Sequence, residues 1–209
     1  MIDHGAFGAS EFRARTGASD QTMADLERFR ELLAEWNGRM NLVGPSALAE
    51  FWLRHAYDSA QLLGFAPAAK TWADLGAGAG FPGVVLAILR KDQGGMVHLV
   101  DSLLKRCRFL SAVAEDLVLP VEVHHARGET WKRKGVDILT ARALAPLPRL
   151  LIYAEPMLKA GATGLFLKGR DVEAELTEAR KSWTFRHDLT PSLSDPEGRV
   201  LKLWSLARA

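Results

Sequence analysis

The chain has 209 residues, 48% of them hydrophobic, and its 27 Lys and Arg against 25 Asp and Glu give a formal net charge of +2. This composition excludes a disordered acidic tail and a strongly basic DNA-coating protein, although a nearly neutral sum can hide a basic patch. The single cysteine, Cys107, excludes an internal disulfide and a cysteine-based zinc cluster. A lone thiol suits a reducing compartment, and no apolar run is long enough to span a bilayer. We therefore expect a soluble, cytoplasmic protein.

The first 70 residues are expected to form a helical extension packed on the core. Apolar residues recur in steps of three and four between Asp20 and Met40, which predicts a helix with Asp20 as its N-cap. Pro45 interrupts this pattern, and Ser46 predicts the start of a second helix that ends at Gly64. Residues 71–209 then form the main domain of a single compact unit.

From Thr71 onward, short apolar runs alternate with helical stretches. Strands are predicted over 71–75, 97–100, 121–124, 136–140, 164–167, 184–189 and 200–206. Helices are predicted over 82–90, 102–115, 146–158 and 172–181. This alternation is typical of the α/β class, with a mostly parallel, doubly wound sheet and helices on both faces.

A glycine-rich loop between the first strand and its helix is the most informative segment. Gly76, Gly78 and Gly80 alternate there, which lets the backbone turn sharply and approach a ligand closely. The N–H groups at the start of the next helix would face an anionic part of that ligand. Asp101, at the end of the following strand, could accept hydrogen bonds from both hydroxyls of a ribose, or simply favour a helix N-terminus. The loop therefore predicts a nucleotide-like ligand.

Two features favour S-adenosylmethionine over a nicotinamide dinucleotide. The spacing of Gly78, Gly80 and Gly83 also matches a dinucleotide-binding loop, so that spacing alone does not decide. However, the run from Asp74 to Gly80 is denser in glycine than a dinucleotide loop requires. The chain also leaves little length for a separate catalytic domain and has no Tyr-x-x-x-Lys pair. A non-catalytic nucleotide-binding module remains an alternative.

Five stretches, in order, resemble the bacterial small-subunit (16S) ribosomal RNA guanine-N7 methyltransferase family, also called the glucose-inhibited division protein B family. They are Leu33–Asn37 with Met40–Leu42, Arg54–Ser59, Asp74–Gly83, Asp101–Arg106 with Phe109–Leu110, and Ala141–Pro146. Leu167–Gly169 is a weaker match. The resemblance implies a Rossmann-like class I S-adenosylmethionine-dependent methyltransferase with a seven-stranded sheet.

Carried over to this sequence, the family's cofactor contacts fall on Gly76 and Phe81 in the loop, Gly128 and Glu129 after the third strand, and Arg142 after the fourth. Gly76 would allow close approach to the methionine part, and Phe81 would provide an apolar wall. The guanidinium of Arg142 suits the cofactor carboxylate, although Arg142 could instead belong to a structural ion pair.

Basic residues near the expected cleft are candidates for contact with RNA. Residues 1–60 hold six basic and nine acidic side chains, whereas residues 90–149 hold eleven basic and seven acidic ones. Lys105 and Arg106 follow Asp101 closely and are expected at the rim of the cleft. His55, Asp58 and Lys168 complete the candidates. His55 and Asp58 lie on a helix that the resemblance places over the cleft, where a local His–Asp hydrogen bond is the alternative.

The implied reaction moves a methyl group from S-adenosylmethionine to N7 of a guanine in 16S ribosomal RNA. That nitrogen carries a lone pair and no proton, so alignment can suffice and no catalytic acid or base is expected. The substrate would be 16S RNA or an assembling small subunit, with a monomeric enzyme favoured. A methyltransferase for a small molecule or protein remains an alternative. No metal site is expected, because His124 and His125 are adjacent on a strand and point to opposite faces.

Overall fold

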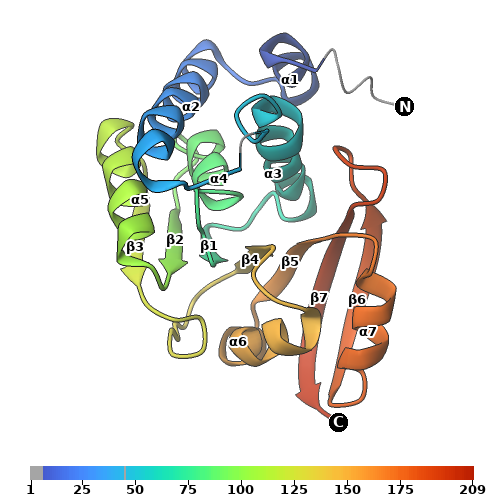
Figure 1. Ribbon diagram of the computed structural model, residues 1–209. Coiled ribbons are helices and arrows are strands. Elements are labelled where there is room, and N and C mark those ends of the chain that lie inside the picture. The colour runs from blue at the N-terminus through green and yellow to red at the C-terminus, as the bar shows by residue number, and fades with distance from the viewer. Residues whose placement is uncertain (1–6, 45) are drawn as a thin grey trace.

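The computed structural model describes residues 7–44 and 46–209. A sheet runs through the molecule in the order β3-β2-β1-β4-β5-β7-β6 (Figure 1). Its strands are β1 (Thr71–Leu75), β2 (Met96–Asp101), β3 (Val121–His125), β4 (Ile138–Arg142), β5 (Thr163–Lys168), β6 (Trp183–Pro191) and β7 (Arg199–Arg208). The first five strands pair in parallel, and β7 runs antiparallel to both β5 and β6. This is the mostly parallel, seven-stranded sheet that the sequence predicts.

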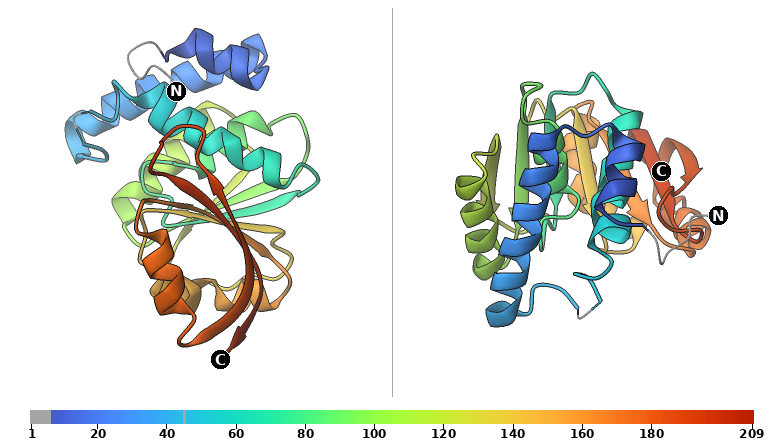
Figure 2. Two further views of the ribbon diagram at one scale, coloured as in Figure 1. Left: turned by 90° about the vertical axis from the view of Figure 1, so that its right-hand side faces the viewer. Right: turned by 90° about the horizontal axis from the view of Figure 1, so that it is seen from above.

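Helices cover both faces of the sheet (Figures 1 and 2). One face carries α1 (Ala9–Thr16), α2 (Asp20–Met40), α4 (Gly83–Leu89), α5 (Leu104–Asp116) and a helical segment built from η1 (Phe51–Tyr57), α3 (Asp58–Ala60) and η2 (Gln61–Phe65). The other face carries α6 (Leu147–Lys159) and α7 (Val172–Ala179). Within the described residues, no helix is both long and apolar enough to cross a membrane.

Aromatic side chains hold the N-terminal helices against the sheet. The ring of Phe29 on α2 lies 5.9 Å from Phe51, 5.3 Å from Phe81 and 6.4 Å from Phe109, so it joins the helical segment, the glycine loop and α5. Such pairs each contribute about 0.5–1.5 kcal/mol beyond the burial of their area. Apolar residues before residue 70 therefore share one hydrophobic core with those of the sheet.

Several element boundaries differ from the predicted ones. Ser19, not Asp20, is the N-cap of α2, because its Oγ accepts the N–H of Thr22 at 3.2 Å while Asp20 occupies the first turn. Residues 46–50 form turns, and the second helical segment begins at Phe51 with a wide π-helical turn and ends at Phe65. Strand β4 lies two residues later than predicted. The carboxylate of Asp137 accepts the N–H groups of Lys70 and Thr71, so Asp137 serves the start of β1.

Candidate active site

The glycine loop between β1 and α4 is fixed by the buried carboxylate of Asp74. One oxygen accepts the N–H of Gly83 at 2.9 Å, and the other accepts the hydroxyl of Thr140 on β4, also at 2.9 Å. Burial raises the pKa of Asp74 to about 7, against the hydrogen bonds that lower it. A Cβ at position 83 would collide with Leu99 and with the Asp74 carboxylate, so α4 can begin this close to the sheet only with glycine. Asp74 therefore anchors the loop from a buried position.

Asp101, at the end of β2, fixes the other side of this loop. Its carboxylate accepts the N–H of Gly78 at 2.9 Å and the N–H of Leu103 at 2.8 Å. The second bond delays the start of α5 to Leu104, two residues after the predicted start. The guanidinium of Arg106 lies 3.5 Å from the same carboxylate. Asp101 is thus held rigidly where the loop meets the strand.

A cavity of about 440 Å³, the glycine-loop cleft, lies beside these groups. Its lining includes Gly76, Asp101, Arg106, Gly128, Glu129 and Tyr153. The cleft lies near the carboxyl ends of β1, β2 and β4, and the order of the strands reverses between β1 and β4. Ligands of doubly wound sheets bind at this kind of switch point. The structure therefore brings five of the predicted site residues to one cleft.

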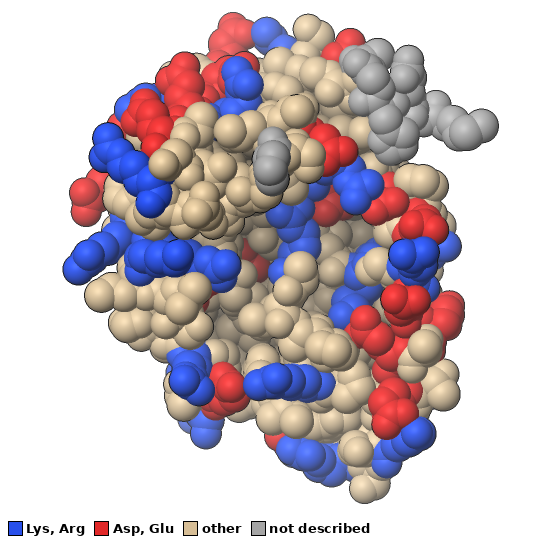
Figure 3. Space-filling view, viewed as in Figure 1, with Lys and Arg blue, Asp and Glu red and all other residues tan. Residues whose placement is uncertain are grey.

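A second cavity of about 730 Å³, the hairpin cavity, lies between the helical segment and the turn that joins β6 to β7. Its lining includes His55, Asp58, Arg142, Lys168, Ser194 and Arg199. Ala143 and Leu144 line both cavities, so the two spaces adjoin at the end of β4. Ala143 has a φ of 52°, which is strained for a residue with a side chain. Figure 3 shows Lys and Arg side chains on several sides of the hollow at the centre of that view.

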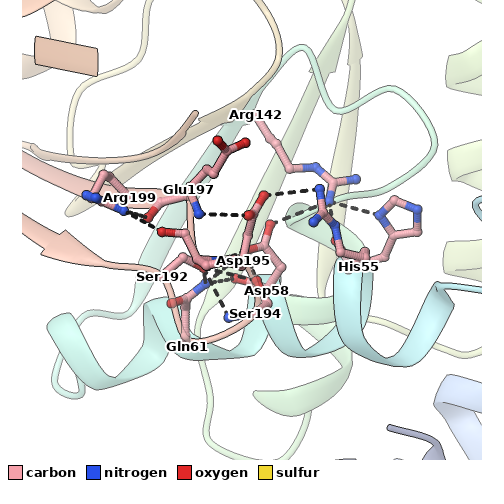
Figure 4. A network of polar contacts seen from close by, with 12 residues as sticks. His55, Asp58, Gln61, Arg142, Ser192, Ser194, Asp195, Glu197 and Arg199 are labelled. Atoms are coloured by element: carbon pink, nitrogen blue, oxygen red, sulfur yellow. Dashed lines mark hydrogen bonds and ion pairs between the residues drawn. The ribbon is translucent and has the colours of Figure 1, made fainter. Parts of the chain in front are cut away.

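Arg142 is the centre of a polar network at the hairpin cavity (Figure 4). Its Nη1 donates to the backbone carbonyl of Arg54 at 3.0 Å and lies 3.6 Å from the carboxylate of Asp58. The same atom donates to Nδ1 of His55 at 3.0 Å. Because a guanidinium has no acceptor, His55 Nδ1 accepts, so the ring is neutral and carries its proton on Nε2. Burial and the nearby Arg142 lower the pKa of His55 to about 4, which agrees with the neutral form.

The turn between β6 and β7 is tied to the helical segment by the carboxylate of Asp58. That carboxylate accepts the hydroxyl of Ser194 at 2.5 Å and the amide of Gln61 at 2.9 Å. Gln61 also accepts the N–H of Leu193 at 2.9 Å, and Arg54 pairs with Asp195 at 3.1 Å. Burial raises the pKa of Asp58 despite these donors. Residues more than 130 positions apart in sequence therefore form one wall of the cavity.

The three basic candidates for RNA contact have different surroundings. Arg106 lines the glycine-loop cleft, as expected of a rim residue. The exposed Lys105 donates to the carbonyl of Met40 at 3.4 Å, at the end of α2. Lys168 is nearly buried and pairs with Glu175 at 2.5 Å, so its charge is compensated within the protein.

Some predicted residues lie outside both cavities. Gly78, Gly80, Phe81 and Lys105 appear in neither lining, and the ring of Phe81 stacks under His55 at 4.6 Å with Arg142 5.1 Å away. Conversely, sequence reasoning missed Tyr153 and Arg149 on α6 and the serines of the β6–β7 turn. Tyr153 follows the helical repeat of an apolar face, and no motif marks Ser192 or Ser194. The alternative of a local hydrogen bond between His55 and Asp58 is not seen, and each of the two contacts Arg142 instead.

Comparison with known proteins identifies relatives along almost the whole chain. The family model GidB, described as rRNA small subunit methyltransferase G, matches residues 22–197. The ribosomal RNA small subunit methyltransferase G of Caulobacter vibrioides is 61% identical over 201 residues, which cover 96% of this chain and 93% of the relative. The protein of the same name from Methylorubrum populi is 48% identical over 193 residues, which cover 91% of this chain and 92% of the relative.

Solved structures share the fold at low sequence identity. A magnesium protoporphyrin IX methyltransferase from Synechocystis superposes with a TM-score of 0.59 at 13% identity, covering 90% of this chain and 99% of that one. A SAM-dependent methyltransferase from Aquifex aeolicus has a TM-score of 0.56 at 16% identity, covering 84% and 98%. The predicted Rossmann-like methyltransferase fold is confirmed. The family expected from the five sequence stretches is confirmed as well: the chain belongs to the rRNA small subunit methyltransferase G family.

Proposed function

We propose that this chain transfers a methyl group from S-adenosylmethionine to N7 of a guanine in the 16S RNA of the small ribosomal subunit. The observation that carries this proposal is the pair of cavities that adjoin at Ala143 and Leu144. The glycine-loop cleft takes the cofactor and the hairpin cavity takes the guanine, so the methyl group crosses at the end of β4. Family membership supports the choice of ribosomal RNA as substrate.

In this proposal the cofactor extends from Gly76 to Gly128. The Asp101 carboxylate, held by two backbone N–H groups, accepts the ribose hydroxyls, and the exposed Glu129 meets the edge of the adenine. Arg142 directly precedes Ala143, where the two cavities adjoin, and among the described residues the hydrogen bonds and the ion pair of its guanidinium all use Nη1. Its Nη2 and Nε therefore have the geometry to bind the cofactor carboxylate. Gly78 and Gly80 shape the loop, and Phe81 supports Arg142 and His55 from beneath.

The chemistry requires alignment and no proton transfer from the attacking atom. Guanine N7 offers its lone pair to the methyl carbon, the carbon–sulfur bond breaks, and the sulfonium becomes a neutral thioether. The product guanine carries the positive charge. Nearby Asp58 and Asp74 are engaged in hydrogen bonds, and neither is required as a base. The protein contributes by holding two reactants in line and excluding water.

Lys105 and Arg106 are proposed to contact the RNA backbone. Arg106 also positions Asp101, whereas Lys168 holds the β5 end through Glu175 and contacts no RNA. We propose that the enzyme acts as a cytoplasmic monomer. Light scattering during gel filtration tests the monomer.

A substitution that fills only the hairpin cavity tests the division of roles. Gly169 lines that cavity and lies outside the glycine-loop cleft, and a Cβ added at this position would meet open space. Gly169→Trp is expected to keep the calorimetric affinity for S-adenosylmethionine and to lower methyl transfer to unmodified small-subunit RNA at least tenfold. Gly38→Trp is the matched control, because Gly38 has the same open surroundings on α2 and lines neither cavity.

The outcomes separate the two parts of the proposal. If Gly169→Trp weakens cofactor binding as much as transfer, the assignment of the two cavities is wrong. If the unchanged chain binds S-adenosylmethionine and forms no N7-methylguanine in that RNA, the assigned substrate is wrong. Mapping N7-methylguanine in RNA from cells with and without the gene decides which guanine is modified.

A further inference from the structure

Two histidines and a glutamate converge on β2 and β3, at the edge of the sheet. The parallel pairing places His98 opposite Glu122 and Val100 opposite His124. Because alternate residues of a strand share a face, Glu122 and His124 project to the same side as His98. The neighbouring His125 points the other way, where its Nε2 donates to the carbonyl of Ser102 at 3.1 Å. The cluster therefore unites residues that the sequence separates by more than 20 positions.

The spacing of the three side chains fits one small cation. His98 Nδ1 lies 3.1 Å from His124 Nε2 and 3.3 Å from Glu122 Oε2, and His124 Nε2 lies 3.8 Å from Glu122 Oε1. Ligands at the Zn–N distance of about 2.0–2.1 Å and tetrahedral angles stand about 3.3 Å apart. The observed separations are close to that edge length, so little movement would bring all three onto a metal ion.

The surroundings hold the ligands in place and leave one side open. The His98 side chain is 1% exposed, that of His124 is 18% exposed and that of Glu122 is 49% exposed. The ring of Trp131 packs 6.0 Å from His98 and 5.3 Å from His124, which restricts both imidazoles. Arg133 lies 3.4 Å from Glu122 and competes for that carboxylate, but its side chain is 44% exposed and has room to turn outward.

We propose that His98, Glu122 and His124 bind a Zn²⁺ ion, with water at the remaining position. Imidazole nitrogens and a carboxylate oxygen are common zinc ligands, and three protein ligands with water in the fourth position is the arrangement that catalytic zinc sites use. The ion would join the edge strand β3 to β2 just before the segment that carries Gly128 and Glu129. It would therefore stabilise one wall of the glycine-loop cleft without taking part in methyl transfer.

Zinc titration of the full chain tests this site. The protein is stripped with a chelator, dialysed and titrated with ZnCl₂ by calorimetry, and we expect one equivalent to bind and to raise the thermal unfolding midpoint. His124→Ala and Glu122→Gln should each weaken that binding at least tenfold. His125→Ala is the matched control and should bind zinc like the unchanged chain.

A second probe reports the geometry directly. Co²⁺ in place of Zn²⁺ should give the strong visible absorption of a tetrahedral ion, and His124→Ala should lose it while His125→Ala keeps it. Glu122 is half exposed, so Glu122→Gln should leave the fold intact. This variant therefore still tests the site if His124→Ala disturbs folding. The proposal is overturned if no saturable equivalent binds, if His124→Ala and Glu122→Gln bind as tightly as the unchanged chain, or if His125→Ala abolishes binding.

Discussion

The glycine-loop cleft and the hairpin cavity are held together by different kinds of contact. Around the cleft, carboxylates fix the glycine loop by accepting backbone N–H groups: the buried Asp74 accepts from Gly83, and Asp101 in the lining accepts from Gly78 and Leu103. In the hairpin cavity, side chains contact side chains from distant segments, with Asp58 joined to Arg142 and Ser194. The first arrangement fixes the path of the backbone, whereas the second depends on three separate elements meeting.

This contrast suits two different ligands. A cofactor of constant shape is bound by a rigid loop on rigid strand ends, which keeps its reactive group in place. A base that is presented by RNA must enter and leave, and the wall beside it includes a turn that is secured mainly by hydrogen bonds to one carboxylate. We therefore expect changes in the cleft to alter cofactor affinity, and changes in the network to alter both stability and transfer.

The largest effect is expected from neutralising Asp74, which tests how rigidly the loop is anchored. The pKa of the Asp74 carboxyl is near 3.8 in the unfolded chain and near 7 in the folded chain, so the folded chain holds this proton up to a higher pH. The free energy of unfolding of the unchanged chain should therefore fall as pH rises from about 4 to about 7, by up to about 1.4 kcal/mol per pH unit and about 4 kcal/mol in total.

Asp74→Asn should remove that loss. The side-chain oxygen of the new Asn can accept the N–H of Gly83, and its NH₂ group can donate to the hydroxyl of Thr140. That hydroxyl can then donate to the carbonyl of Ala73, which lies 3.4 Å away. Urea unfolding at several pH values measures both chains, and their difference in stability should grow with pH in favour of Asn. A difference that stays constant between pH 4 and 7 would show that Asp74 ionises normally in the folded chain.

Removing the cation of the hairpin network is expected to cost about 3 kcal/mol of stability, because it leaves the buried carboxylate of Asp58 without its charged partner. Arg142→Met keeps the length of the side chain and should also reduce methyl transfer severely. Denaturant midpoints of Arg142→Met, Asp58→Asn and the double variant measure the coupling. The double variant should be more stable than the sum of the single losses predicts. Strict additivity would mean that the two residues act independently.

Replacing the acid at the end of β2 is expected to affect the cofactor and leave the hairpin network intact. Asp101→Ala removes hydrogen bonds to a charged acceptor, worth about 2 kcal/mol, so the dissociation constant for S-adenosylmethionine should rise about 30-fold. Glu115→Ala makes the same change of charge at an exposed position of α5 and serves as the control. Unchanged affinity in calorimetry would remove Asp101 from the ribose site.

The same contrast explains which parts of the site could be read from the sequence. The glycine loop and Asp101 are local signals, because a strand, a turn and a helix follow one another within 30 residues, and their positions came out as predicted. Family resemblance indicated Gly128, Glu129 and Arg142, whose contacts with a cofactor stay predictions. Ser194 and Gln61 acquire their roles only when β6 and β7 fold back onto the helical segment. No sequence motif marks these two residues. The contact between His98 and His124 is equally absent from the sequence pattern, because it depends on the pairing of β2 with β3.

The smallest effect is expected at an exposed lysine of α5 outside both linings, where charge acts through solvent. Lys105 is exposed beside the end of α2, and Lys105→Ala should weaken RNA binding and lower the slope of log affinity against log salt by about 0.7–0.9. Lys181→Ala is the matched control, because that exposed lysine pairs with Glu178 at the end of α7, outside both cavities. Filter binding at several salt concentrations measures both. Equal slopes for the two variants would place the RNA away from α5, and would assign its contacts to the basic side chains on another side of the hollow.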